Sequence, residues 1–364
     1  MVLHIFNPEH DIALASGLAN FTAPHAGRQL RHDLGFLPAL WAGRGDVILV
    51  DNVELAQKSY QRVRAALRPV LPSGALPLAK PLFAHCRVPL SFLQDPVFCP
   101  WGWNPALKSF LVRMGYAAHL LPSDAQLDSV RQLSHRREAA RLLPALRRSG
   151  TVGEAFECRS TDEAGRLLRH YGRIVMKAPW SSSGRGVRFA DLGEAGSVKQ
   201  ANDWCWLGNV IGRQGSVMIE PYYAKVRDFG MEFHSDGQGG VTYQGLSLFH
   251  TVNGAYEGNL LATETKKQEI INRYIPATLL DYVKETVCTV LGDAYKDRYQ
   301  GPFGIDMMVV GSGEGYLLHP CVEINLRRTM GHVALALSPS DDDVQRVMCI
   351  TYSENNYKLN IKRI

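Results

Sequence analysis

Residues 301–328 carry the pattern that most restricts how this chain can fold. Two apolar segments, 302–310 and 316–326, flank the sequence Gly311-Ser312-Gly313-Glu314-Gly315. Two strand-like segments joined by a glycine-rich turn are typical of a β-hairpin. Because side chains alternate across a strand, one face of such a hairpin can pack on a core while the other carries polar groups. We therefore expect two antiparallel strands here, with any functional side chains on one face.

Oxygen-bearing side chains gather on that polar face. Glu323 and Asn325 share one side of their strand, because the residues that alternate with them are apolar. Asp306 lies between apolar residues of the partner strand and faces the same way, although the long turn leaves the register open. Two carboxylates and an amide oxygen suit Mg²⁺ or Mn²⁺, and simple solvation of the acidic groups is the alternative. Arg327 and Arg328 follow directly, which suits a site that receives further anionic groups.

A second pattern lies at residues 173–189, where a strand ends in Lys177 and a loop rich in serine and glycine follows. Such a loop exposes backbone N–H groups and hydroxyls that can surround phosphate oxygens, and Lys177 adds a positive charge. Ordinary hairpins also contain serine and glycine, and the sequence has no GxxxxGK[ST] motif. The loop alone is therefore a weak signal for phosphate binding.

Between the two patterns, residues 217–223 indicate a strand that is interrupted at Pro221. A proline in a strand frees nearby backbone groups from the ladder, so that they can meet a ligand. Glu220 precedes this proline, two tyrosines follow it, and Asp228 opens the next strand. Each feature alone is compatible with an ordinary loop, and only their order along the chain is informative.

This order resembles the ATP-grasp superfamily over roughly residues 134–331, more than half of the chain. The most specific part of the resemblance is a set of five positions: Lys177, Glu220, Asp306, Glu323 and Asn325. No single motif among them would suffice, but five positions in the same order are hard to obtain by chance.

The resemblance implies a role for each matching residue. It assigns the ATP phosphates to Lys177, Ser181, Ser182, Ser183 and Gly184, the adenine and ribose to Glu220, Tyr222, Tyr223 and Asp228, and the Mg²⁺ ions to Asp306, Glu323 and Asn325. Lys177 and Arg327 are the implied catalytic residues, and Arg327 would contact the transferred phosphoryl group or the substrate.

The chain departs from the resemblance at one position. Most members of the superfamily carry a second phosphate-contacting lysine near the start of the helix that precedes the first strand. Ser134-His135-Arg136-Arg137 stands at about that place, so Arg136 or Arg137 would have to substitute. Both keep the positive charge, and arginine can bind a phosphate through two parallel hydrogen bonds.

The first third of the chain indicates a separate α/β unit. Short apolar runs at 2–6 and 47–50 alternate with a helical pattern at 53–67, as strand, helix and strand would. Asn104 is expected to cap a further helix that begins at Pro105.

Substrate contacts are expected near the carboxyl ends of these strands, because ligands of open α/β sheets bind there. Glu9, Asp11 and Asn104 would lie at this edge, and Arg328 is a further candidate for contact with the substrate. Ordinary turns and packing are the alternative explanation for these residues.

The expected architecture is therefore mixed α/β and α+β. A Rossmann-like pre-ATP-grasp domain is expected at 1–122, followed by a two-lobed ATP-grasp fold with antiparallel sheets. Its central lobe is expected at 123–215 and its C-terminal lobe at 216–364.

The implied activity is that of an ATP- and Mg²⁺-dependent ligase, with Mn²⁺ as the alternative metal. It would activate a small-molecule or peptide carboxylate as an acyl phosphate, which an amine or other nucleophile then attacks. The alternatives are an ATP-grasp kinase that phosphorylates a small molecule and a non-catalytic nucleotide-binding protein. The sequence leaves the oligomeric state open.

Charge, cysteine content and hydropathy limit where the protein is expected to reside and which classes of partner it is expected to bind. The formal charge is +5, from 40 basic and 35 acidic residues, which does not demand nucleic acid. The seven cysteines contain no CxxC pair, so we expect reduced thiols and a cytoplasmic protein. No run approaches the roughly 20 apolar residues of a membrane span, so no membrane partner is expected.

Overall fold

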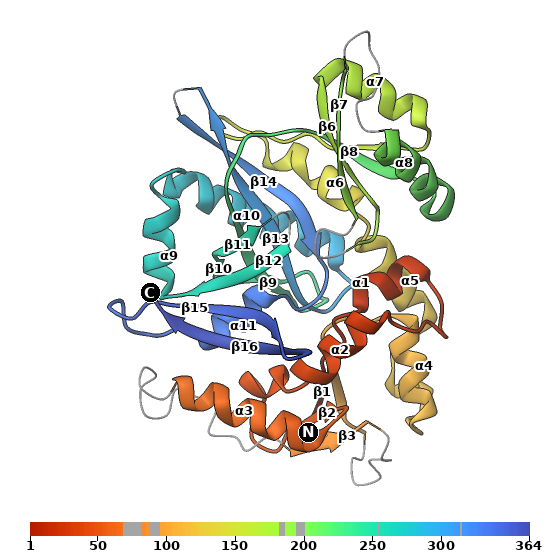
Figure 1. The fold of residues 1–364 in the computed structure, drawn as a ribbon, viewed down its shortest axis with the longest axis vertical. Coiled ribbons are helices and arrows are strands. Elements are labelled where there is room, and N and C mark those ends of the chain that lie inside the picture. Colours follow the sequence, from red (N-terminus) through yellow and green to blue (C-terminus); the bar gives the residue numbers. More distant parts are fainter. Residues whose placement is uncertain (68–81, 87–94, 182–185, 194–200, 253–254, 314) are drawn as a thin grey trace.

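Within the residues that the structure describes, four four-stranded sheets make up the framework of the molecule (Figure 1). The computed structural model describes residues 1–67, 82–86, 95–181, 186–193, 201–252, 255–313 and 315–364. In the view of Figure 1 the N-terminal sheet lies at the bottom, a small antiparallel sheet lies at the upper right, and the large central sheet lies between them.

The N-terminal sheet is parallel, with the strand order β3-β2-β1-β4. Its strands are β1 (Val2–Ile5), β2 (Val47–Val50), β3 (Leu82–His85) and β4 (Val97–Pro100). Its helices are α1 (His10–Ser16), α2 (His25–Leu34), α3 (Val53–Leu67) and α4 (Pro105–Arg113), with short 3₁₀ turns at Leu37–Leu40 and Ala118–Leu120. The expected strands and the expected helix at 53–67 are present, and the Asn104 side chain accepts the first-turn N–H of Leu107 as the predicted cap.

Two helices, α5 (Asp124–Leu133) and α6 (Arg137–Leu146), lead from this unit to the second sheet. That sheet is antiparallel in the order β5-β8-β6-β7. It consists of β5 (Phe156–Cys158), β6 (Arg173–Lys177), β7 (Val187–Asp191) and β8 (Val217–Pro221), with α7 (Thr161–Tyr171) and α8 (Ala201–Gln214) packed against it.

The central sheet contains the hairpin that the sequence predicts. Its antiparallel order is β10-β9-β13-β14. Its strands are β9 (Lys225–Ser235), β10 (Val241–Ser247), β13 (Gly301–Ser312) and β14 (Gly315–Asn325). The neighbouring helices are α9 (Glu264–Ile271), α10 (Ala277–Tyr295) and α11 (Met330–Leu337).

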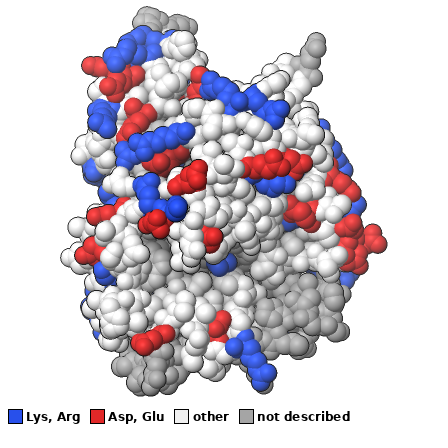
Figure 2. Space-filling view, turned by 180° about the vertical axis from the view of Figure 1, so that it is seen from behind, with Lys and Arg blue, Asp and Glu red and all other residues white. Residues whose placement is uncertain are grey.

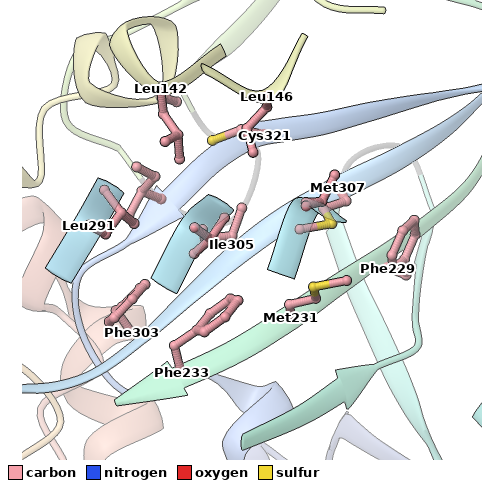
Figure 3. Close-up of a cluster of buried hydrophobic side chains, with 14 of the residues drawn as sticks. Leu142, Leu146, Phe229, Met231, Phe233, Leu291, Phe303, Ile305, Met307 and Cys321 are labelled. Carbon is pink, nitrogen blue, oxygen red and sulfur yellow. The ribbon is translucent and has the colours of Figure 1, made fainter. Parts of the chain in front are cut away.

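One face of the central sheet builds the largest core of the described residues. Phe229, Met231 and Phe233 of β9 lie beside Ile305 and Met307 of β13, and α6 and α10 cover them (Figure 3). Burial of these side chains is the main source of stability for this part of the fold. Since side chains alternate, the opposite face of the same strands is the one that carries polar groups.

The fourth sheet joins the C-terminus to the N-terminal unit. Its antiparallel order is β11-β12-β15-β16. Its strands are β11 (Phe249–Val252), β12 (Ala255–Leu261), β15 (Arg346–Ser353) and β16 (Asn356–Arg363). Strand β16 packs against α2 and α3, and the Tyr357 backbone N–H donates to Asp33 at 2.8 Å.

No helix within the described ranges is long and apolar enough to cross a membrane. On the face that Figure 2 shows, acidic and basic side chains are interspersed rather than separated into large patches.

Candidate active site

Asp306 and Glu323 lie directly opposite each other on neighbouring strands of the central sheet. The register pairs them across β13 and β14, and the pairing shifts immediately beyond, between Asp306 and Met308. Burial raises the pKa of Asp306, and the nearby carboxylates of Glu323 and Glu232 raise it further. A cation between the two acidic groups would relieve this repulsion. The structure thus supplies the register that the sequence leaves open.

Asn325 and Arg327 extend this acidic pair toward the N-terminal unit. Asn325 donates its Nδ2 to Asp306 at 3.1 Å, and its Oδ1 accepts from Arg327 at 2.9 Å. Arg327 also contacts both carboxylate oxygens of Asp11, with its Nε 3.0 and 2.9 Å from them. A continuous set of polar contacts therefore runs from the hairpin to α1.

Arg136 connects the acidic pair to the loop that follows β6. Its Nη2 lies 2.9 Å from Glu323 Oε1 and donates to Ser181 Oγ at 3.2 Å. Arg137 instead contacts Glu157, at 3.4 Å, and Gln132. Of the two arginines that the sequence offers, the structure brings Arg136 to the acidic pair and directs Arg137 elsewhere.

Lys177 and Glu220 form a buried ion pair on neighbouring strands of the second sheet. Their Nζ and Oε2 atoms are 2.6 Å apart, and both residues are buried. The pair lies against β14, because both charges influence the pKa of His319 and of Cys321 on that strand. The two patterns found in the sequence are thus brought together across the two sheets.

The remaining predicted nucleotide contacts are spread around this centre. Asp228 pairs in register with Met308, which is two residues from Asp306 on β13, so Asp228 and Asp306 share the polar face of the central sheet. The Asp228 carboxylate accepts hydrogen bonds from Lys225 Nζ and from Thr251 Oγ1, both at 2.6 Å. Tyr223 packs edge-on against His319, whereas Tyr222 lies at the surface, where the Arg173 guanidinium covers one face of its ring. Ser182, Ser183 and Gly184 lie outside the described residues.

The four predicted substrate residues each lie in different surroundings. Glu9 pairs with Arg31 at 3.1 Å and lines a cavity in the N-terminal unit. Asn104 is buried, and beyond its capping bond it lies 3.3 Å from His10 Nδ1. The Arg328 guanidinium packs over the ring of Trp41 at 4.5 Å. Asp11 is the one of the four whose side chain contacts the predicted catalytic Arg327.

The sequence reasoning missed Glu232, a buried carboxylate on the polar face of β9. Its Oε2 accepts from Thr329 Oγ1 at 2.8 Å and lies 3.0 Å from His332 Nδ1. A Cβ added to Gly331 would fall 1.8 Å from Glu232 Oε1, so this glycine makes room for the carboxylate. The alternation that groups Glu323 with Asn325 also groups Glu232 with Asp228, and it was the available signal.

The donor set fits a hard divalent cation that keeps several exchangeable ligands. In the described part of the chain, no three or more His, Cys, Asp or Glu side chains are arranged to hold a metal ion. A cation at Asp306 and Glu323 would therefore complete its shell with an amide, water or phosphate oxygens. That is the usual behaviour of Mg²⁺, which is commonly bound through one or two carboxylates and a substrate phosphate.

Comparison of the sequence with protein-family models finds no match, and neither does comparison with curated proteins. Among solved structures, the chain is similar to the biotin carboxylase domain of 2-oxoglutarate carboxylase from Hydrogenobacter thermophilus, crystallised with MgADP, ADP and bicarbonate. The TM-score is 0.50 at 12% identity, and the match covers 89% of this chain and 73% of that one.

Two further structures match nearly the whole chain. N5-carboxyaminoimidazole synthetase from Staphylococcus aureus has a TM-score of 0.49 at 11% identity and covers 97% of this chain and 83% of its own. A putative ATP-grasp superfamily protein from Archaeoglobus fulgidus has a TM-score of 0.48 at 11% identity, with coverages of 100% and 99%. The similarity to the biotin carboxylase domain confirms the expected ATP-grasp fold.

Proposed function

We propose that this protein is an ATP- and Mg²⁺-dependent ligase that activates a carboxylate as an acyl phosphate for attack by an amine. The observation that carries the proposal is the directly paired Asp306 and Glu323, with Arg136 and Arg327 in the same polar contact set. Opposite charges arranged in this way suit a polyanion that arrives together with a divalent cation.

Asp306, Glu323 and Asn325 would hold Mg²⁺, or Mn²⁺ as the alternative. When bound, the ion would neutralise charge on the nucleotide phosphates and orient them. Arg136 lies 2.9 Å from Glu323, and Lys177 lies 2.6 Å from Glu220. Each of these two cations is thus paired with a carboxylate in this structure. Triphosphate oxygens would exchange for those carboxylates, because arginine and lysine bind phosphate as well as carboxylate.

The chemical logic needs no nucleophilic side chain. A carboxylate oxygen of the substrate forms a bond to the γ-phosphorus while the bond to the β,γ-bridging oxygen breaks, and ADP leaves. The amine then forms a C–N bond to the acyl carbon, the C–O bond to phosphate breaks, and inorganic phosphate departs with the electron pair. Arg327 is held by Asp11 and Asn325 beside Asp306, where it would stabilise charge on the transferred group.

The test is product analysis with MgATP and a panel of carboxylates, each with and without amines. We expect ADP and inorganic phosphate to form in equal amounts only when both the carboxylate and the amine are present. Mass spectrometry should then detect the condensed product of the two. The Glu323→Gln variant should abolish this release, whereas Glu285→Gln, an exposed position on α10, should retain it. A stable phosphorylated product without free phosphate would establish the kinase instead, and MgATP binding without turnover across the panel would establish a non-catalytic role.

A further inference from the structure

A cavity of about 220 Å³ lies in the N-terminal unit, at the carboxyl ends of β1 and β2. Pockets for drug-sized ligands measure roughly 300–1,000 Å³, so this cavity suits a smaller molecule. Buried side chains of Ile5, Leu49, Val50 and Leu107 form part of its apolar wall, and Phe21 and Phe110 also line it. Its polar lining includes five charged side chains, those of Glu9, Arg28, Arg31, Asp51 and Arg113.

Glu9 presents an unpaired carboxylate oxygen at this cavity. Its Oε1 accepts from Arg31 Nη1 at 3.1 Å, while its Oε2 is buried without a hydrogen-bond partner among the described residues. The side chain is only 11% exposed, and burial raises the pKa of Glu9 in spite of the neighbouring Arg31. An unpaired buried acceptor is costly, so a donor on a ligand would stabilise it.

Asp51, the other carboxylate of the cavity, is already engaged. Its Oδ1 accepts from Cys86 Sγ at 3.2 Å, and its Oδ2 accepts from Arg31 Nε at 3.2 Å. Glu9 is therefore the acidic group of the cavity that has an oxygen without a hydrogen-bond partner among the described residues. A primary ammonium group fits its free oxygen best, because it carries three donors and a positive charge.

Two exposed arginines of the lining supply the complementary charge. Arg28 Nη1 donates to the Ala23 carbonyl at 3.2 Å, and Arg113 Nη1 donates to Ser109 Oγ at 2.6 Å. A guanidinium has five N–H donors, so both side chains keep donors for an incoming carboxylate. The cavity thus offers an acidic group inside and basic groups beside it.

The cavity is connected to the proposed reaction centre through the start of α1. Glu9 and Asp11 are two positions apart, so their Cα atoms are at most about 7.6 Å from each other. Asp11 holds Arg327, which in turn contacts Asn325 of the metal-binding set. The residue that would hold the ammonium group and the residue that holds Arg327 therefore both lie at the start of α1.

We propose that this cavity binds a small free amino acid, with its ammonium group at Glu9 Oε2 and its carboxylate at Arg28 and Arg113. That this amino acid is the amine substrate rests on the proposed ligase function, whereas binding of the amino acid to the cavity needs no nucleotide. As the amine substrate, its nitrogen would form a C–N bond to the acyl carbon of the acyl phosphate while the C–O bond to phosphate breaks. The nitrogen would lose two protons as the ammonium group becomes an amide.

The test is calorimetric titration of the protein, without nucleotide, with each of the twenty common L-amino acids as probes. For each amino acid that binds, the analogue without the amine and the analogue without the carboxylate are titrated as well. We expect at least one amino acid to bind, and both of its analogues to bind at least tenfold more weakly. Glu9→Gln should weaken the amino acid at least tenfold, while Glu54→Gln, an exposed position on α3, should bind it as the wild type does.

The proposal is overturned if no amino acid binds, or if the analogue without the amine binds as tightly as its parent. Equal binding by folded Glu9→Gln would overturn it too. Should that variant fail to fold, the analogue comparison on the wild-type protein decides alone. An amino acid that binds but never supports ADP release with any carboxylate would refute the ligase function and leave the cavity assignment standing.

Discussion

Asp11 and Arg327 form a partly buried two-point ion pair although 316 positions separate them in the chain. Arg327 Nε and Nη2 each lie 2.9 Å from the same Asp11 oxygen, and Nε lies 3.0 Å from the other. Burial alone would raise the pKa of Asp11, but Arg327 holds it below its usual value. This contact ties α1 to the segment that follows β14, so it positions the N-terminal unit against the acidic pair of the central sheet.

We predict that Asp11→Asn lowers the free energy of unfolding by about 2 kcal/mol, because it leaves the partly buried Arg327 charge without its carboxylate partner. Urea denaturation measures this change. Asp281→Asn is the matched control, since it removes an exposed partner of Lys284 and should cost less than about 0.5 kcal/mol. Equal losses in the two variants would show that the Asp11–Arg327 pair contributes no more to stability than an exposed pair.

Arg136 offers a graded test of nucleotide binding. Arg136→Lys keeps a cation at the place where the resemblance expects a lysine, so we predict MgADP affinity within tenfold of wild type. Arg136→Gln removes the charge and should weaken MgADP about 100-fold, a loss of about 2.7 kcal/mol. Arg141→Gln, which removes an exposed charge on α6, is the control and should leave MgADP affinity unchanged. Isothermal titration distinguishes these outcomes, and an unaffected Arg136→Gln would remove Arg136 from the phosphate site.

The close approach of Glu232 to Gly331 predicts that this glycine does not tolerate a side chain. Gly331→Ala would place its Cβ 1.8 Å from Glu232 Oε1 and 2.5 Å from Ser247 Oγ, so the buried carboxylate has to move. We expect a loss of about 1–3 kcal/mol in stability from this overpacking, measured by urea denaturation. Gly212→Ala in α8 is the control, because nothing lies within 4 Å of its added Cβ and alanine favours a helix. If both variants keep wild-type stability, Glu232 is not held as tightly as its contacts indicate.

Local pattern was sufficient to identify the hairpin and the shared face of Glu323 and Asn325, because strand alternation needs no tertiary information. The same pattern could not set the register opposite Asp306, since the pairing shifts right after it at a bulge. The choice between Arg136 and Arg137 depends on where α6 begins relative to the loop after β6, which is a tertiary property.

Contacts between residues far apart in the chain could not be predicted from the sequence for a different reason. Nothing in the local pattern around Asp11 indicates Arg327, because the contact exists only once the N-terminal unit docks on the central sheet. Glu232 was within reach, since its spacing from Asp228 places both on one face of β9. It was missed because a single acidic residue between apolar neighbours is ordinarily solvated, whereas here α11 covers it.

Buried histidines predict how stability depends on pH. His10, His135 and His319 are almost fully buried, and burial lowers the pKa of each to about 4. In the unfolded chain they titrate near 6.5, so below that pH the unfolded state binds more protons than the folded state. The contribution of these histidines to stability is therefore fully present above pH 6.5 and falls as the pH drops toward 4, by roughly 2 kcal/mol per histidine between pH 7 and pH 5.

The contribution of one histidine can be isolated by variants. His319→Gln should reduce the loss of unfolding free energy between pH 7 and pH 5 by roughly 2 kcal/mol, because a glutamine has no proton to gain. His119→Gln should leave that loss unchanged, since His119 is exposed in the folded protein as it is in the unfolded chain. Urea denaturation at the two pH values measures both. Parallel pH profiles for wild type and His319→Gln would show that the His319 ring gains its proton as readily in the folded protein as in the unfolded chain, contrary to its burial against Gly153 and Tyr223.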